Sequence, residues 1–239
     1  MLLFYVSMKL VILAAGKGTR MGDLTINKPK PLVPFKNKTI LFFILFFLKK
    51  VRLINEIILV VDERNLELFD SYIKSLNYPK KINIISQDKE LKGTYAALYS
   101  AREFLVNEPE FLVTNGDDIH SPDTFESVLQ KPGYVLGVQN VPFKKGYYNV
   151  VSIDGIFDKF ESNNSNHVTI LASGLYKLKK DFLDLKPTQI QGSEFGIPQT
   201  LVQVKEYEPI HVVFSKDSIF INTKEDLDNA EIKLKIDII

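Results

Sequence analysis

Cysteine is absent from this 239-residue sequence, and so is any excess of charge of one sign. Without cysteine the chain has no disulfides, no thiolate nucleophile and no cysteine-ligated metal site, which is in keeping with a cytoplasmic protein. Lysine and arginine total 30 against 29 aspartates and glutamates, so the net charge of +1 recruits neither nucleic acid nor an anionic membrane. The three histidines lack metal-ligand spacing. Any charge that binds a ligand is therefore expected to be local.

Apolar runs of membrane-spanning length are also lacking. The run at residues 40–48 is followed by Lys49 and is far shorter than the roughly 20 residues that span a bilayer, so it predicts a buried helix. The first seven residues have neither the basic segment nor the small-residue cleavage site of a secretory signal. We expect either that Met8 is the natural start or that residues 1–7 are a dispensable extension.

Hydrophobic patterning of the first half predicts an α/β fold. Short runs rich in β-branched residues predict strands at residues 9–13, 56–61, 81–86 and 110–114. Longer apolar or amphipathic segments predict helices at residues 39–53, 64–76 and 94–106. Thr39 and Thr94 are suitable caps for two of these helices. The alternation favours a Rossmann-like three-layer sandwich, with a mostly parallel mixed sheet between two layers of helices.

The second half has a different hydrophobic pattern from the first. Runs joined by turns predict antiparallel strands at residues 134–141, 147–153, 156–161 and 167–178. Two further helices are expected at residues 193–202 and 223–235. We therefore expect a single domain over residues 1–239, in which a first half at about 8–120 is extended by an antiparallel second half at about 121–239.

A glycine-rich loop follows the first predicted strand. Residues 13–21 are Leu-Ala-Ala-Gly-Lys-Gly-Thr-Arg-Met, and residues 28–32 are Lys-Pro-Lys-Pro-Leu. Gly16 and Gly18 allow the main chain to pass close to a ligand and to point N–H groups at anionic oxygens. Lysine and arginine side chains add positive charge to the same segment. Because ligands lie beyond the carboxyl ends of the strands in open α/β sheets, this loop predicts a polyphosphate site.

Taken whole, this string resembles the signature of the sugar-1-phosphate nucleotidyltransferases, the enzymes that make nucleotide-diphosphate sugars. The resemblance implies transfer of a nucleotidyl group from a nucleoside triphosphate to a sugar 1-phosphate, with release of pyrophosphate. It also implies that the first half binds the nucleotide and that the second half binds the acceptor. Dinucleotide and P-loop fingerprints fit less well, because their glycine spacing is not matched.

Three residues are catalytic candidates by this resemblance. In the family, the arginine of Gly-Thr-Arg and the second lysine of Lys-Pro-Lys-Pro bind the triphosphate, and these correspond to Arg20 and Lys30. Asp117 follows a glycine at the end of the predicted strand at 110–114, where the family has a Gly-Asp that holds a metal ion. Mg²⁺ prefers such oxygen ligands and is the expected cofactor. Asp118 is a weaker candidate ligand.

The nucleotide is expected to contact the glycine loop and one further element. Gln87, followed by Gly93 and Thr94, resembles the base-binding glutamine and Gly-Thr of the family. The interval is one residue longer than usual, with Lys92 as the insertion, so the base is not assigned. The residues expected at the nucleotide are Leu13, Ala14, Ala15, Gly16, Gly18, Thr19, Gln87, Gly93 and Thr94.

On the acceptor side the chain departs from the family. The lysine that grips the sugar phosphate in relatives is missing, and Lys159 is a nearby lysine on the same strand face as Glu161. Asn149 stands where many relatives have glycine. Gly174 either leaves room for a sugar ring or marks a bulge in a core strand. Glu194 matches a position that binds sugar hydroxyls, or serves a helix dipole.

The second metal ligand is open between two interpretations. The usual aspartate of the family corresponds to Phe220 here. In some relatives an asparagine has this role, and Asn222 would then coordinate through its amide oxygen. Alternatively, Asn222 and Thr223 cap the last predicted helix.

Three functions are open from sequence. The leading one is the sugar-1-phosphate nucleotidyltransferase, with a nucleoside triphosphate and a phosphorylated small molecule as its partners. The altered acceptor motifs leave open a cytidylyltransferase acting on a non-sugar phosphate such as phosphocholine. The missing lysine and aspartate leave open a non-catalytic subunit that binds a nucleotide sugar. No nucleic acid or membrane partner is expected, and homo-oligomer formation is left open.

Overall fold

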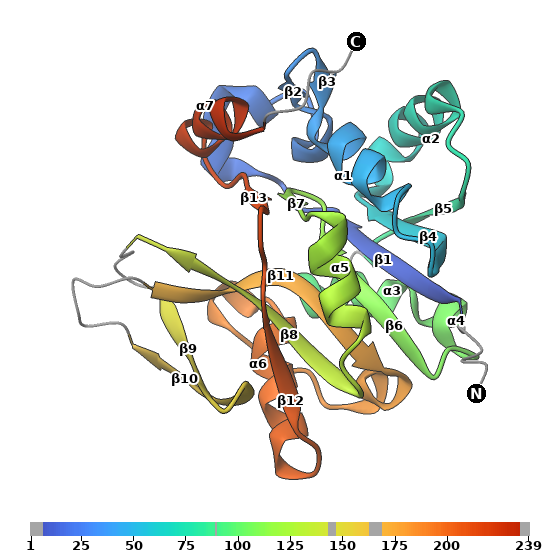
Figure 1. Ribbon diagram of the computed structural model, residues 1–239. Helices are drawn as coiled ribbons and strands as arrows, with labels where there is room; N and C mark the ends of the chain where they lie inside the picture. The colour runs from blue at the N-terminus through green and yellow to red at the C-terminus, as the bar shows by residue number, and fades with distance from the viewer. Residues whose placement is uncertain (1–6, 89, 143–146, 163–168, 235–239) are drawn as a thin grey trace.

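The computed structural model describes residues 7–88, 90–142, 147–162 and 169–234. A nine-stranded mixed sheet has the strand order β5-β4-β1-β6-β11-β8-β12-β10-β9 (Figure 1). Its strands are β1 Met8–Ala14, β4 Ile54–Val61, β5 Lys81–Ser86, β6 Glu110–Asn115, β8 Tyr134–Val141, β9 Tyr148–Ile153, β10 Ile156–Ser162, β11 Thr169–Lys179 and β12 Ile210–Phe214. Two short pairs are separate from it: β2 Pro34–Phe35 with β3 Lys38–Thr39, and β7 Asp118–Ile119 with β13 Ile219–Phe220.

The strand directions confirm the parallel first half and modify the second. Strands β1, β4, β5 and β6 run parallel to their neighbours in this group. Strand β11 is antiparallel to both β6 and β8, and β10 is antiparallel to both β9 and β12. Strand β12, however, pairs parallel to β8, so the second half is not wholly antiparallel. Strand β12 is not among the predicted elements, because a short apolar run has no diagnostic period.

Helices cover both faces of the sheet. They are α1 Ile40–Leu48, α2 Leu66–Leu76, α3 Thr94–Ser100, α4 Arg102–Leu105, α5 Pro122–Leu129, α6 Ile197–Leu201 and α7 Lys224–Lys233. Short 3₁₀ segments are η1 Thr19–Thr25, η2 Lys30–Leu32, η3 Glu63–Asn65, η4 Lys180–Asp184, η5 Gln191–Ser193 and η6 Val202–Glu206. In β1, Leu10 and Ile12 join one hydrophobic cluster, whereas Val11 and Leu13 join the other, because successive strand side chains alternate. The three-layer sandwich is therefore confirmed.

Two helix predictions differ from the structure at their amino ends. Thr39 caps α1 as expected, since its hydroxyl accepts a hydrogen bond from Phe42 N at 3.1 Å. Thr94 is not a cap; Gly93 precedes α3 and provides no side-chain hydrogen bond. The helix predicted from residue 193 begins only at Ile197, because Glu194 forms an isolated parallel bridge with Lys92.

Within the described ranges, no helix combines the length and the apolar character that crossing a bilayer requires.

Candidate active site

A cleft of about 1110 Å³ lies at the carboxyl ends of the parallel strands. The loops that follow β1, β4, β5 and β6 line one part of it, and β11, the segment around α6 and Asn222 line the other. All nine residues predicted at the nucleotide line this cleft. Arg20, Lys30 and Asp117 line it as well. The parallel sheet thus brings together segments that are about a hundred residues apart in sequence.

The glycine loop is shaped by its contact with the lysine-proline segment. Gly18 has φ +64°, a left-handed conformation that costs other residues free energy. A Cβ at Gly18 would lie 3.0 Å from Lys30 Cβ, so the loop and the lysine segment are packed directly together. The Thr25 hydroxyl donates to Gly18 O at 2.9 Å and fixes the following turn. These contacts fix the conformation of the loop, which lines the cleft.

Lys30 and Asp117 contact each other directly. Lys30 is buried, with an exposed fraction of only 6%, and its Nζ donates to Asp117 Oδ2. The prolines on either side of Lys30 restrict the backbone that carries it. Two of the catalytic candidates, a buried cation and a carboxylate, are thereby brought to one point from segments far apart in the sequence.

Asp118 is held in a different environment from Asp117. It is buried and accepts a hydrogen bond from Asn115 Nδ2 at 2.8 Å. Burial, and then the neighbouring Asp117 carboxylate, raise the pKa of Asp118 well above its usual range. Asp117 lines the cleft, whereas Asp118 is not among the lining residues. The geometry therefore favours Asp117 over Asp118 as the candidate metal ligand.

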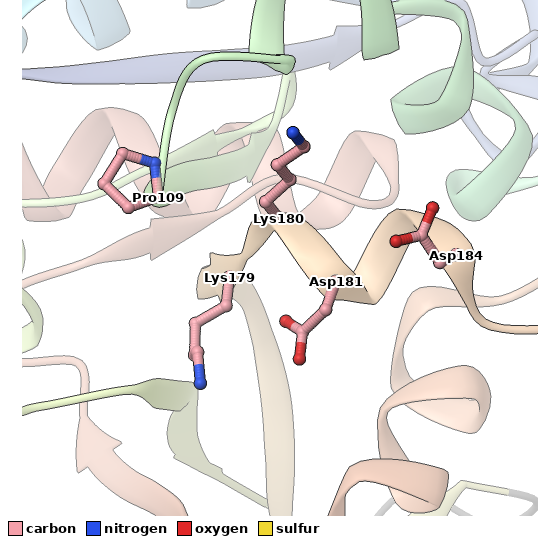
Figure 2. A pocket seen from close by; sticks show the side chains of 5 residues that line it. All are labelled: Pro109, Lys179, Lys180, Asp181 and Asp184. Carbon is pink, nitrogen blue, oxygen red and sulfur yellow. The ribbon is translucent and has the colours of Figure 1, made fainter.

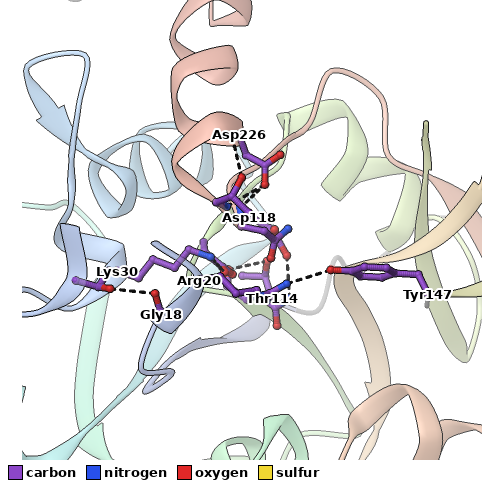
Figure 3. Close-up of polar contacts among 12 residues, drawn as sticks. Gly18, Arg20, Lys30, Thr114, Asp118, Tyr147 and Asp226 are labelled. Carbon is purple, nitrogen blue, oxygen red and sulfur yellow. Dashed lines mark hydrogen bonds and ion pairs between the residues drawn. The ribbon is translucent and has the colours of Figure 1, made fainter. Parts of the chain in front are cut away.

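Arg20 contacts the second half of the chain. It lies in η1, directly after the glycine loop, and its Nη1 donates to Tyr147 Oη at 3.2 Å (Figure 3). Tyr147 precedes β9 and belongs to the second half of the chain. The contact links the two halves at the catalytic candidate, and Tyr147 was not singled out by any sequence motif.

The predicted base-binding element is tied to the acceptor side. Gln87 Nε2 donates to Leu91 O at 3.0 Å, which closes the loop that carries the inserted Lys92. Phe195 N donates to Lys92 O at 2.8 Å. The Thr94 hydroxyl accepts from Ile197 N at 3.0 Å, so this threonine anchors the start of α6. The loop after β5 and the segment at 194–197 therefore form one packed unit.

The acceptor candidates fall into two groups. Gly174 and Glu194 line the cleft, whereas Asn149, Lys159 and Glu161 are not among its lining residues. Asn149 Oδ1 accepts from Ile170 N at 2.8 Å and so bridges to strand β11. Lys159 Nζ lies 3.3 Å from Glu161 Oε2, and both side chains are about half exposed. The expected shared strand face of Lys159 and Glu161 is found, but it does not face the cleft.

Gly174 is required by the protein itself. Its φ is +74°, and the pairing of β11 with β8 shifts register between Ala172 and Tyr176. A Cβ at Gly174 would lie 2.2 Å from both Asn115 Nδ2 and Asp118 Oδ2. The bulge interpretation therefore holds, and it places Gly174 against the strand end that carries Asp117.

Asn222 fits both of its predicted roles. Thr223 and Asp226 form a capping box at the start of α7, and Asp226 Oδ2 also accepts from Asn222 N at 2.9 Å. The Asn222 side chain lines the same cleft as Asp117. The described residues contain no group of three or more histidine and carboxylate side chains able to hold a metal ion. One carboxylate with one amide oxygen suits Mg²⁺, which keeps several waters and shares substrate phosphates.

One ion pair in the cleft has no sequence signature beyond its place at a strand end. Asp62 follows β4, and its carboxylate accepts from Arg64 Nε and Nη2, each at 2.8 Å. The Arg64 hydrogen bond holds the pKa of Asp62 below its usual range. The rule that ligands bind beyond the carboxyl ends of parallel strands could have identified this pair.

A second, smaller cavity lies at the opposite end of the sheet. It measures about 270 Å³ and is lined by Pro109, Lys179, Lys180, Asp181 and Asp184 (Figure 2). Lys179 Nζ pairs with Glu208 at 2.7 Å, and Asp181 Oδ1 accepts from Tyr134 Oη at 2.6 Å. None of the predicted functional residues lines this cavity.

Comparison with known proteins identifies the family of this chain. Residues 9–132, just over half of the chain, match the model of the nucleotidyl transferase family, and the chain belongs to this family. The bifunctional protein GlmU of Methanocaldococcus jannaschii is 34% identical over 181 residues, which cover 74% of this chain and 41% of that protein. The bifunctional sugar-1-phosphate nucleotidylyltransferase/acetyltransferase of Sulfurisphaera tokodaii is 32% identical, with 73% and 41% covered.

The fold has close counterparts among solved structures. The inositol-1-phosphate CTP transferase from T. maritima superposes with a TM-score of 0.76 at 17% identity, with 98% of this chain and 99% of that one covered. At this identity the likeness shows the fold alone. The chain spans less than half the length of the two bifunctional relatives.

Proposed function

We propose that this chain transfers a nucleotidyl group from a nucleoside triphosphate to a sugar 1-phosphate. One observation carries the proposal: Arg20, Lys30 and Asp117 converge on one cleft beside the glycine loop. The chain's relatives include a sugar-1-phosphate nucleotidylyltransferase, which supports the same reaction class. The single domain then divides into a nucleotide half, at about residues 8–120, and an acceptor half, at about residues 121–239.

The reaction requires two anions to be held in line. An oxygen of the acceptor phosphate attacks the α-phosphorus, and the bond from that phosphorus to the oxygen bridging to the β-phosphate breaks, so that pyrophosphate leaves. No covalent enzyme intermediate is needed, because the acceptor phosphate is itself the nucleophile. Arg20 and Lys30 neutralise the triphosphate, and the glycine loop offers main-chain N–H groups to its oxygens. Asp117 and Asn222 would hold Mg²⁺, which lowers the negative charge of the phosphates.

Metal-dependent pyrophosphate release tests the proposal. The protein is incubated with each nucleoside triphosphate and a panel of acceptors comprising glucose, mannose, N-acetylglucosamine and inositol 1-phosphates and phosphocholine. We expect pyrophosphate from at least one sugar 1-phosphate, and its loss when EDTA removes Mg²⁺. Turnover with phosphocholine alone would support the cytidylyltransferase instead. A folded protein that binds nucleotide without metal, and yields no pyrophosphate with any pair, would be a non-catalytic binder.

A further inference from the structure

The cationic side chains of the cleft all come from the nucleotide half. Those that line it are Lys17, Arg20, Lys30, Arg64 and Lys92. In the described part of the acceptor half, no lysine or arginine lines the cleft, and the charged side chain there is the acidic Glu194. Among the described residues, a cation for an incoming phosphate therefore has to come from across the cleft.

Lys159 does not supply this cation. Its Nζ lies 3.3 Å from the Glu161 carboxylate, its side chain is 57% exposed, and it does not line the cleft. Of the cleft cations, Lys30 forms an ion pair with Asp117, and Arg64 forms one with Asp62. Arg20 is instead bonded to a residue of the acceptor half, the Tyr147 hydroxyl, at 3.2 Å.

The contact with Tyr147 orients Arg20 toward the acceptor half, where an acceptor phosphate would bind. An arginine presents five N–H donors in a planar fork, so one bond to Tyr147 leaves donors for more than one anion. A long exposed side chain also has considerable rotamer freedom, which a hydroxyl partner reduces. Figure 3 shows Arg20 and Tyr147 pointing toward one another beside Lys30 and Asp118.

We propose that Tyr147 is a positioning residue that holds the Arg20 guanidinium toward the acceptor half, so that Arg20 binds the acceptor phosphate as well as the triphosphate. This inference rests on the proposed function. It gives the acceptor phosphate a cation that comes from the nucleotide half of the chain. The oxygen of Tyr147 acts on the substrate only through Arg20.

Tyr147→Phe tests the inference by removing only the hydroxyl. The net worth of such a hydrogen bond predicts a rise of about three- to tenfold in the KM of the acceptor. The KM of the nucleoside triphosphate is expected to change less than about twofold, because the phenylalanine leaves Arg20 in place to bind phosphate. Tyr78→Phe is the matched control: it removes a hydroxyl that donates to Leu45 O at 2.9 Å, outside the cleft. It is expected to leave both KM values unchanged.

A double-mutant cycle separates positioning from a general structural effect. Dissociation constants of the acceptor are measured by calorimetry with a non-hydrolysable triphosphate bound, so that no turnover is needed. In an Arg20→Lys background, Tyr147→Phe is expected to have no further effect, because the shorter, unforked cation does not reach the hydroxyl. Equal effects of Tyr147→Phe in both backgrounds would overturn the inference, as would equal rises in both KM values. If the wild-type protein releases no pyrophosphate with any pair, the proposed function fails and the inference falls with it.

Discussion

The two halves of the cleft recognise their ligands by different means. In the nucleotide half, Lys17, Arg20 and Lys30 come from the segment around the glycine loop, and Arg64 and Lys92 add two further cations. The acceptor half presents small and neutral groups together with the acidic Glu194, and these come from β11, the segment around α6, and Asn222. A triphosphate has the same charge pattern whatever its base, so one short segment can bind it. Acceptors differ in shape, and their site is assembled from distant parts of the chain.

Two glycines of the cleft, one from each half, differ in their surroundings. A Cβ added at Gly16 would meet no heavy atom within 4 Å, so this glycine is open to the cleft, whereas Gly174 is packed against Asn115 and Asp118. We expect the first to serve a ligand, whereas the packing of the second serves the fold. The comparison therefore predicts that changes in the nucleotide half affect binding, and that changes at Gly174 affect stability.

The largest effect is expected for Asp117→Asn. Losing this carboxylate should lower pyrophosphate release by about a thousandfold, because a metal ion supplies several kcal/mol of transition-state stabilisation. Turnover as a function of Mg²⁺ concentration is the measurement. Asp70→Asn is the matched control, since Asp70 pairs with Lys74 on α2, at 2.6 Å, and does not line the cleft. A loss of less than about tenfold for Asp117→Asn would show that Asp117 is not part of the catalytic site.

Gly174→Ala is expected to destabilise the fold by about 3 kcal/mol. The new Cβ meets Asn115 and Asp118, and the left-handed backbone adds strain. Urea unfolding measures the change. Gly16→Ala should alter the free energy of unfolding by less than about 0.5 kcal/mol while weakening triphosphate binding. Equal stability losses at the two glycines would contradict the division drawn between them.

The junction of the two halves should be sensitive to acid. His120 follows β7, its Nδ1 lies 3.2 Å from Ser218 Oγ, and burial lowers its pKa to about 3. The unfolded chain, in which histidine titrates near pH 6.5, binds the extra proton first. Stability therefore falls as the pH drops from about 6.5 toward 3, by up to about 1.4 kcal/mol per pH unit from this residue. His120→Asn should remove that part of the slope in urea unfolding across this range; an unchanged slope would contradict the assignment.

The smallest effect is expected for Lys159→Met. An exposed ion pair contributes about 0.2–1 kcal/mol, and Lys159 does not line the cleft, so the KM of the acceptor should change less than about twofold. Lys30→Met removes the same charge from a buried position in the cleft and should lower activity by about a hundredfold. A large effect at Lys159 would show that acceptor recognition extends onto strand β10.

Much of the fold was predictable because its signals are local. The first four parallel strands and the cap of α1 by Thr39 follow from short-range patterns in the sequence. Strand β12 and the late start of α6 were not predictable, because pairing with β8 and the bridge between Lys92 and Glu194 decide them. In the site, the glycine loop was predictable as a contiguous string. The exclusion of Asn149, Lys159 and Glu161 from the cleft was not, since it depends on how β9 and β10 sit at the edge of the sheet.

By itself the sequence determined the glycine-rich loop, the alternation of strands and helices, and the family to which the chain belongs. These features depend on neighbouring residues and on the spacing of apolar side chains along the sequence, and both are local signals. Only the tertiary structure decided that Lys30 contacts Asp117, that Arg20 contacts Tyr147, and that Gly174 packs against Asp118. Each of these contacts joins segments dozens of residues apart or more, and strand order and register bring them together.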